Sequence, residues 1–183
     1  MNKHKRKSMR LCDYDYSSEG GYFITIVTVN REPLFGRIVN GNMVLNDFGK
    51  IVREEWLQTG INRRNVEIYE DEFCIMPNHF HAIIWIVDIN KNHVARMGDT
   101  ARRVPTRFGK PVEGSLSTII GAFKSAATRR INALRGVEGE MVWQSRFYEH
   151  IIRGERDYYE ISEYIALNPA GWEKDQDYVK DFG

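Results

Sequence analysis

Two histidines stand two positions apart at the start of an apolar run, as His79-Phe80-His81 followed by Ala-Ile-Ile-Trp-Ile-Val87. On a β-strand, residues i and i+2 point to the same face. The two imidazoles would therefore lie side by side, while Phe80 turns the other way into apolar packing. That spacing suits chelation of one divalent cation. Two half-exposed histidines on a sheet face would give the same pattern, so the pair alone leaves both interpretations open.

A second candidate group lies towards the C-terminus. Tyr158, Ile161 and Ile165 are spaced for one face of a helix that packs on the sheet. Tyr164 and Asn168 lie four residues apart at the edge of that face. A tyrosine in that place is either an amphipathic boundary residue or a nucleophile whose neighbour Asn168 reaches a metal. Four other tyrosines compete for the nucleophile role: Tyr148, Tyr158, Tyr159 and Tyr178.

Charge is segregated along the chain, although 26 basic and 25 acidic side chains leave a net charge of only +1. Residues 1–10 carry five basic and no acidic side chains, and residues 91–135 carry ten basic and two acidic ones. The acidic excess lies in residues 11–90 and 136–183. Such segregation creates local fields that the net charge hides. A basic segment interrupted by aromatic residues is typical of phosphate contacts.

We therefore predict a DNA-binding surface built from the basic residues of both segments, and we expect it to guide DNA to the face that bears the histidines. Its predicted members are Lys5, Arg6, Lys7, Arg10, Arg102, Arg103, Lys124, Arg129 and Arg130. A nucleic-acid-binding field, a metal between two histidines and a tyrosine hydroxyl together describe a site for phosphodiester transesterification.

Length and composition limit the other possibilities. The 183 residues, 42% of them hydrophobic, suit one compact domain with a buried core. Cys12 and Cys74 are too few and too far apart for a disulfide framework or a CxxC zinc site, which favours a reduced, cytoplasmic location. No apolar run approaches the roughly 18 residues of a membrane span, so no membrane partner is expected. The chain contains neither a GxxxxGK[ST] nor a GxGxxG phosphate loop.

The elements that must position these residues follow in the order β-α-β-β-α-β with one further helix. The predicted strands are 22–29, 66–75, 79–87 and 142–152, and the predicted helices are 46–60, 115–134 and 157–168. This order predicts an α+β, ferredoxin-like fold, with an antiparallel sheet, two helices on one face and a C-terminal helix. Around it we expect a basic N-terminal arm (1–21), a flexible basic insertion (88–114) and an acidic tail (173–183).

The ordered set of motifs resembles a known family. Met76-Pro-Asn-His-Phe-His81 resembles the HUH motif (His-hydrophobe-His) of single-tyrosine transposases, and Tyr164-Ile-Ala-Leu-Asn-Pro169 resembles their nucleophile helix. Further segments are similar to the REP-associated tyrosine transposases (RAYTs), namely Arg6-Lys-Ser-Met-Arg-Leu11, Tyr14-Asp-Tyr16, Gly121-Ala-Phe-Lys-Ser125, Trp143-Gln144 and Phe147-Tyr-Glu-His-Ile-Ile-Arg153. The resemblance spans nearly the whole chain and leaves out only the insertion and the residues after Trp172.

The resemblance implies one HUH transposase domain over residues 1–183, with a ferredoxin-like fold. It implies that His79 and His81 bind a divalent cation, Mg²⁺ or Mn²⁺, and that Asn168 is the third ligand, where some relatives have glutamine. Tyr164 would attack a phosphodiester in single-stranded, hairpin-forming DNA of palindromic repeats. The products would be a 5′-phosphotyrosine link and a free 3′-OH, which allows the strand to be rejoined as well as cut.

Two alternatives stay open at this stage. One is a non-catalytic, ferredoxin-like module that binds DNA or RNA, and the other is a metal-dependent hydrolase in which water is the nucleophile. The resemblance leaves the oligomeric state open between a monomer and a homodimer that exchanges the tyrosine helix. The ordinary pKa of tyrosine is about 10, and the sequence does not identify a general base for Tyr164.

Overall fold

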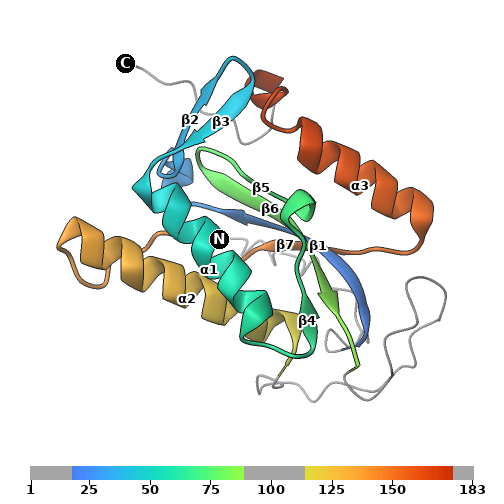
Figure 1. Ribbon diagram of the computed structural model, residues 1–183. Helices are drawn as coiled ribbons and strands as arrows, with labels where there is room; N and C mark the ends of the chain where they lie inside the picture. Colours follow the sequence, from blue (N-terminus) through green and yellow to red (C-terminus); the bar gives the residue numbers. More distant parts are fainter. Residues whose placement is uncertain (1–17, 89–113, 175–183) are drawn as a thin grey trace, which may run out of the picture.

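The computed structural model describes residues 18–88 and 114–174 (Figure 1). Its strands are β1 (Gly20–Val27), β2 (Gly36–Val39), β3 (Asn42–Leu45), β4 (Val66–Glu67), β5 (Phe73–Ile75), β6 (His79–Ile86) and β7 (Tyr148–Ile151). Its α-helices are α1 (Asp47–Ile61), α2 (Leu116–Arg135) and α3 (Glu155–Leu167), and its 3-10 helices are η1 (Val29–Arg31), η2 (Glu70–Glu72) and η3 (Trp172–Lys174). Most of the predicted basic arm, basic insertion and acidic tail lies outside the described residues.

The main sheet has the strand order β4-β6-β1-β7, with β5 also paired to β6. All of these pairings are antiparallel. The register sets Thr25 of β1 opposite His81 of β6 on one side and opposite Tyr148 of β7 on the other. The predicted α+β class, with an antiparallel sheet and three helices, is confirmed.

Two of the predicted strands are shorter than expected. The segment 66–75 is divided into β4 and β5 by η2, whose residue Glu72 turns its side chain into the protein. The segment 142–152 pairs regularly only over β7. Just before β7, the Lys124 ammonium donates hydrogen bonds to the carbonyl oxygens of Gln144 and Ser145, at 2.6 and 3.2 Å. These two carbonyl oxygens thus bond a side chain, and regular pairing with β1 begins only at Tyr148.

No helix or strand is predicted between the strand 22–29 and the helix 46–60, but this segment contains the β2–β3 hairpin. Its two turn residues, Asn40 (φ 52°) and Gly41 (φ 75°), both adopt the left-handed conformation. A two-residue type I′ turn requires that conformation at both positions, and Asn-Gly is its usual sequence. Pro33 and Gly36 made the segment resemble an irregular loop and hid this signal.

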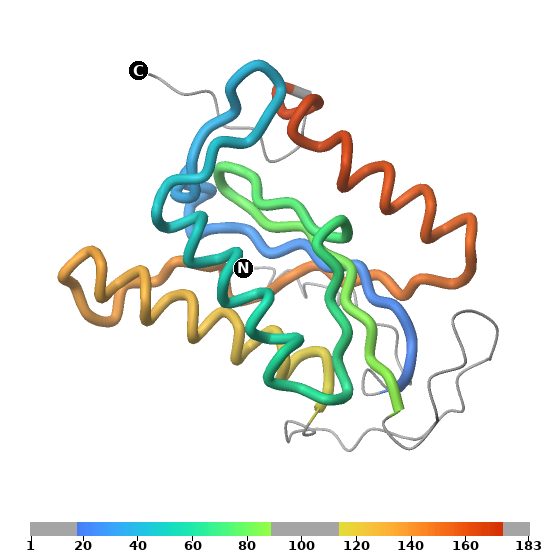
Figure 2. Tube along the Cα trace, viewed as in Figure 1, coloured from blue at the N-terminus to red at the C-terminus, as the bar shows by residue number. Residues whose placement is uncertain are grey.

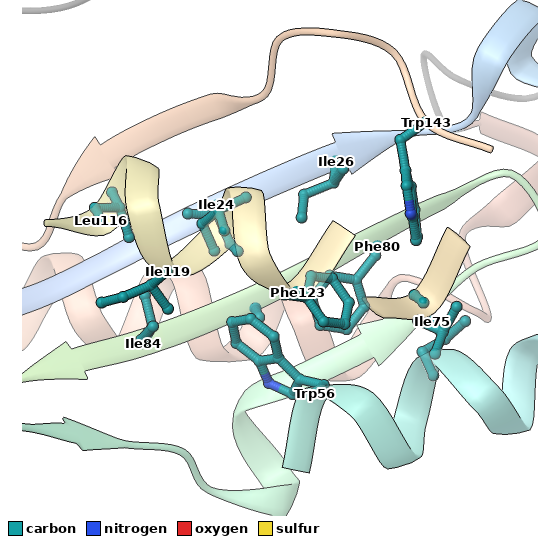
Figure 3. Packing of buried hydrophobic residues seen from close by; sticks show 14 of the residues in the cluster. Ile24, Ile26, Trp56, Ile75, Phe80, Ile84, Leu116, Ile119, Phe123 and Trp143 are labelled. Carbon is teal, nitrogen blue, oxygen red and sulfur yellow. The ribbon is translucent and has the colours of Figure 1, made fainter. Parts of the chain in front are cut away.

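Helices α1 and α2 cover one face of the sheet and enclose the main core (Figure 3). Asn46 caps α1 by accepting a hydrogen bond from the Gly49 N–H at 3.0 Å. Gly136, at φ 69°, ends α2 in the left-handed conformation. The helical spacing of apolar residues over 115–134 predicts that Leu134 lies on the buried face of α2. That face is buried up to Ile131, but Leu134 is 57% exposed, so the prediction is wrong at this residue. No described helix is long and apolar enough to cross a membrane.

Helix α3 covers the opposite face, so the sheet separates it from α1 and α2 (Figure 2). Ile165 packs there against Phe23 and Ile83, as predicted for the apolar face of this helix. The helix begins earlier than predicted, because Gly154 and not Asp157 is its N-cap residue. Asp157 lies in the first turn and accepts a hydrogen bond from the Arg153 N–H at 2.9 Å.

Candidate active site

His79 and His81 lie side by side on the face of β6 that α3 covers. Their ring centroids are 4.5 Å apart, and the side chains are only 0% and 2% exposed. Phe80 between them turns to the other face, where its ring contacts Trp56 and Phe123. The alternation predicted for this strand is confirmed. The alternative of two half-exposed histidines on a sheet face does not hold, because both residues are buried.

Each histidine is oriented through its Nδ1 atom by a polar side chain. His81 Nδ1 is 2.8 Å from Thr25 Oγ1, and His79 Nδ1 is 2.9 Å from Asn78 Oδ1. Such contacts fix the rotation of an imidazole and leave its Nε2 for other chemistry. Sequence reasoning missed both partners. Asn78 is part of the Pro-Asn turn before β6, but Thr25 is identified only by the register between β1 and β6.

The environment keeps His81 uncharged. Burial lowers its pKa well below the ordinary value of 6.5, and repulsion from His79 lowers it further. Both effects disfavour the imidazolium form. A neutral imidazole is the form that can bind a metal or accept a hydrogen bond.

Helix α3 brings Tyr164 to this pair. The Tyr164 hydroxyl is 3.2 Å from His81 Nε2, and the two rings are 5.1 Å apart. Phe23 of β1 supports both rings, stacking on His81 at 5.6 Å and meeting Tyr164 edge-on at 6.1 Å. Tyr164 is 41% exposed, so the residue is also accessible from outside. Of the predicted site residues, the structure thus joins the tyrosine directly to the histidine pair.

The competing tyrosines have other surroundings. The Tyr158 hydroxyl donates to Glu72 at 2.8 Å and so serves the packing of α3. Tyr159 is 63% exposed on α3 and its ring contacts Tyr158. Tyr148 lies on β7, where its ring meets Phe23. Tyr178 lies outside the described residues.

Asn168 is the C-cap residue of α3, one helical turn after Tyr164. It is only 5% exposed, so its amide is held inside the protein. The chain then turns into η3, where the Trp172 ring lies 5.7 Å from that of His79. The end of α3 and the segment after it therefore close the site on the His79 side.

A buried carboxylate anchors α3 to the sheet side of the site. Glu72 is 6% exposed and accepts hydrogen bonds from Trp85 Nε1 at 2.7 Å and from the Tyr158 hydroxyl at 2.8 Å. Burial raises the pKa of Tyr158, and its hydrogen bond to Glu72 raises it further. The sequence did not predict this contact. Residues 70–72 are all acidic, and nothing in their pattern shows that Glu72 is the buried one.

A second polar contact ties the first turn of α3 to β7. His150 Nε2 lies 2.9 and 3.0 Å from the two carboxylate oxygens of Asp157. Burial acts to raise the pKa of Asp157, but the hydrogen bonds from His150 and from the Arg153 N–H outweigh it and lower the pKa. Both ends of α3 are therefore held, by Asp157 at the start and by the buried Asn168 at the end.

The described basic residues of the predicted DNA-binding set lie on α2, which covers the other face of the sheet. Arg130 pairs with Glu54 and Glu55 of α1, at 2.6 and 2.9 Å. Lys124 is engaged with backbone carbonyls, and burial lowers its pKa. Arg129 is exposed. The other six members, Lys5, Arg6, Lys7, Arg10, Arg102 and Arg103, lie outside the described residues, so the predicted DNA-binding surface stays a prediction.

The donors around the histidines fit a divalent cation that accepts mixed nitrogen and oxygen ligands. Two imidazoles, one of them held neutral, and the buried amide of Asn168 supply such a set. Residues 18–88 and 114–174 contain no group of three or more His, Cys, Asp or Glu side chains that could hold a metal ion. A cation would therefore depend on the histidine pair and on the amide.

Comparison with known proteins agrees with this geometry. The chain matches no known family model. It is 43% identical over 177 residues to an uncharacterised protein of Haemophilus influenzae, covering 96% of this chain and 94% of that relative. A second Haemophilus influenzae protein, which carries the provisional name of a REP-associated tyrosine transposase, is 26% identical over 160 residues, covering 85% of this chain and 73% of that relative.

A solved structure shares the fold. It is that of a REP-associated tyrosine transposase bound to a REP hairpin, with a TM-score of 0.51 at 18% identity, covering 90% of this chain and 73% of that one. These comparisons confirm the resemblance that the histidine and tyrosine motifs indicated. The chain belongs to one family with its 43% identical Haemophilus relative and is related to the REP-associated tyrosine transposases.

Proposed function

We propose that the chain is a transposase of the tyrosine type, which cuts and rejoins single-stranded DNA through a covalent link to Tyr164. The observation that carries the proposal is the position of the Tyr164 hydroxyl, 3.2 Å from Nε2 of a buried, neutral histidine. A purely structural tyrosine at a helix edge would not need a histidine pair beneath its hydroxyl.

In the proposed step, the Tyr164 hydroxyl oxygen attacks the phosphorus of a phosphodiester, and the bond from phosphorus to the 3′-oxygen breaks. The 5′-phosphate stays on the tyrosine. Tyr164 loses its hydroxyl proton and the departing oxygen gains one, so the step balances and leaves a free 3′-OH. The reverse attack by a 3′-OH rejoins the strand and frees the tyrosine. The reaction thus conserves the energy of the phosphodiester bond.

The residues around Tyr164 have distinct roles in this proposal. Before a cation binds, His81 Nε2 holds the Tyr164 hydroxyl at the site through their hydrogen bond, and Thr25 fixes the ring of His81. His79, His81 and Asn168 would hold a divalent cation, Mg²⁺ or Mn²⁺, which would polarise a non-bridging phosphate oxygen. Tyr164 must release His81 Nε2 before that nitrogen can act as a ligand.

We propose DNA that forms hairpins as the substrate, since the relative with the same fold is bound to a REP hairpin. The test is a denaturing gel of the protein mixed with labelled hairpin DNA and Mn²⁺. A labelled protein band in the native chain, lost in Tyr164→Phe and in the presence of a chelator, supports the proposal. Tight binding without a band indicates a binding module. Cutting without a band, retained in Tyr164→Phe, indicates a hydrolase.

We further propose that one chain suffices, because Tyr164 and the histidines meet within the same chain. Mixing Tyr164→Phe with a His79→Ala, His81→Ala double variant tests this. Neither variant should form an adduct, and the mixture should form none either. A labelled band in the mixture would show that the tyrosine helix is exchanged between two chains.

A further inference from the structure

A row of side chains runs across the sheet from the histidine pair to β7, the last strand on this side among the described residues. Register places Cys74 of β5, His81 of β6, Thr25 of β1 and Tyr148 of β7 opposite one another in turn. Directly paired residues of antiparallel strands point to the same face. Tyr148 therefore shares the face of His81, two strands away, which is about 10 Å along the row.

Tyr148 and Tyr164 flank the same aromatic support. Both rings meet Phe23 edge-on, at centroid distances of 6.2 and 6.1 Å. Tyr148 is 42% exposed and Tyr164 is 41% exposed, whereas Phe23 between them is buried. In the part of the chain that the structure describes, β7 ends the strand order on this side. A ligand that approaches over β7 reaches Tyr148 before it reaches Tyr164.

We infer that Tyr148 is a binding residue for single-stranded DNA, on which an unpaired base next to the attacked phosphate stacks. An aromatic ring half exposed on a sheet face is how several folds hold unpaired bases, and such stacking tolerates any base. The inference rests on the proposed function for the position of the phosphate. It does not require that the bond be broken.

The spacing favours this role over a purely structural one. A nucleotide whose phosphate reaches Tyr164 has its neighbouring base within the two-strand distance that separates Tyr148 from His81. The chain also enters β7 from Arg146, which is exposed two residues earlier and supplies a positive charge at this edge. A ring needed only for packing would be covered, as Phe23 is at 8% exposure.

The experiment measures affinity in the Tyr164→Phe chain, in which no bond is cut. The probes are hairpin oligonucleotides with a single-stranded flank, in which 2-aminopurine or an abasic nucleotide replaces each flanking base in turn. Tyr148→Leu should weaken binding about 5- to 100-fold, while Tyr148→Phe should stay within about twofold, because the ring and not the hydroxyl stacks. Tyr159→Leu, on an exposed tyrosine away from the row, should not change affinity.

In the chain that keeps Tyr148, an abasic nucleotide at one flanking position should weaken binding as much as Tyr148→Leu does. The same abasic nucleotide should not weaken binding further in Tyr148→Leu. The fluorescence of 2-aminopurine at that position should be quenched only when the Tyr148 ring is present. Unchanged affinity in Tyr148→Leu, or an equal loss in Tyr148→Phe, would overturn the inference. If Tyr148→Leu does not fold, Tyr148→Trp provides the test. Because a larger ring also stacks on a base, Tyr148→Trp must bind the probes at least as tightly as the chain with Tyr148, and weaker binding would overturn the inference. If binding depends on Tyr148 but the native chain forms no covalent adduct, the proposed function is contradicted and the role of Tyr148 is not. If the protein binds none of the probes, both the proposed function and the role of Tyr148 are contradicted.

Discussion

The two faces of the sheet are built differently, although they share the same strands. The α1/α2 face holds a continuous apolar cluster with Trp56, Phe80 and Phe123 at its centre. The α3 face has only a small apolar cluster around Phe23, Ile83 and Ile165. Beside that cluster it buries polar groups instead, among them His79, His81, Thr25, Glu72 and Asn168. One face thus stabilises the fold, and the other buries polar groups at some cost in stability.

This difference predicts that α3 opens more readily than α1 or α2. An element held by a few apolar contacts and by hydrogen bonds exchanges its amides through smaller openings than a core element does. In the proposed function, Tyr164 would have to leave His81 Nε2 to meet a phosphate, and a helix that opens readily would allow this movement. The following changes test the comparison, from the largest expected effect to the smallest.

The largest effect should come from the α1/α2 face. Phe80→Ala removes a fully buried ring that contacts Trp56 and Phe123, and we expect it to lower the free energy of unfolding by about 3–5 kcal/mol. Urea denaturation measures this. Leu134→Ala, on the exposed side of α2, is the control and should change stability by no more than about 0.5 kcal/mol. A loss below about 1 kcal/mol for Phe80→Ala would contradict the assignment of the core.

The anchor of α3 should have an intermediate effect. Glu72→Ala leaves Trp85 Nε1 and the Tyr158 hydroxyl without their acceptor, and should cost about 2–3 kcal/mol. Hydrogen exchange should then accelerate in α3, while the protection of α1 and α2 falls much less. Glu70→Ala, two residues earlier and on an exposed ion pair, should cost no more than about 1 kcal/mol. Equal acceleration in all three helices would show that α3 is not a separately opening unit.

The contact at the start of α3 should make stability depend on pH. The folded-state pKa of Asp157 is lowered, so the carboxylate stabilises the folded protein above its unfolded pKa of about 3.9. That contribution is lost as pH falls through the lower, folded-state pKa. Acid titration of the unfolding free energy should therefore be less steep in Asp157→Asn than in the native chain. Glu138→Gln, at an exposed acid, should keep the native slope, and parallel curves for Asp157→Asn would refute the role of this contact.

The smallest effect should come from the bridge between α1 and α2. Arg130→Ala removes an exposed pairing with Glu54 and Glu55, which should cost about 0.2–1 kcal/mol. Because these acids neutralise Arg130, we expect this variant to change DNA affinity less than Arg129→Ala, whose side chain is exposed. Fluorescence anisotropy with labelled hairpin DNA measures the difference. A larger loss of affinity in Arg130→Ala would mean that DNA displaces the acids.

Local patterns in the sequence were enough to predict the central elements of the site. Alternation along β6 placed His79 and His81 on one face, and helical spacing placed Asn168 one turn after Tyr164. The partners that orient these groups were not predictable. Thr25 and Glu72 act through strand register and tertiary packing, which local periodicity does not contain. The hydrogen bond between Tyr164 and His81 joins residues 83 positions apart.

Three differences between the predicted and the observed fold can be traced to particular residues. Asn40-Gly41 is a local hairpin signal that neighbouring Pro and Gly residues obscured. In the strand predicted over 142–152, the regular ladder begins only at Tyr148, and Lys124 of α2 donates to the carbonyl oxygens of Gln144 and Ser145 just before it. Leu134 continues the apolar stripe of α2, but the helix extends beyond the sheet at that point and the residue is exposed. The Lys124 contact and the exposure of Leu134 depend on tertiary packing, whereas the hairpin signal is local.

The central claim is that Tyr164 forms the covalent link to DNA. The most direct measurement is mass spectrometry of the peptide that carries the nucleotide after the native chain has reacted with hairpin DNA and Mn²⁺ and been digested with trypsin. The peptide 157–174 also contains Tyr158 and Tyr159, so fragmentation distinguishes the three sites. We predict the nucleotide on Tyr164 and no modified peptide in Tyr164→Phe. A nucleotide on another tyrosine, or a modified peptide from Tyr164→Phe, would contradict the account.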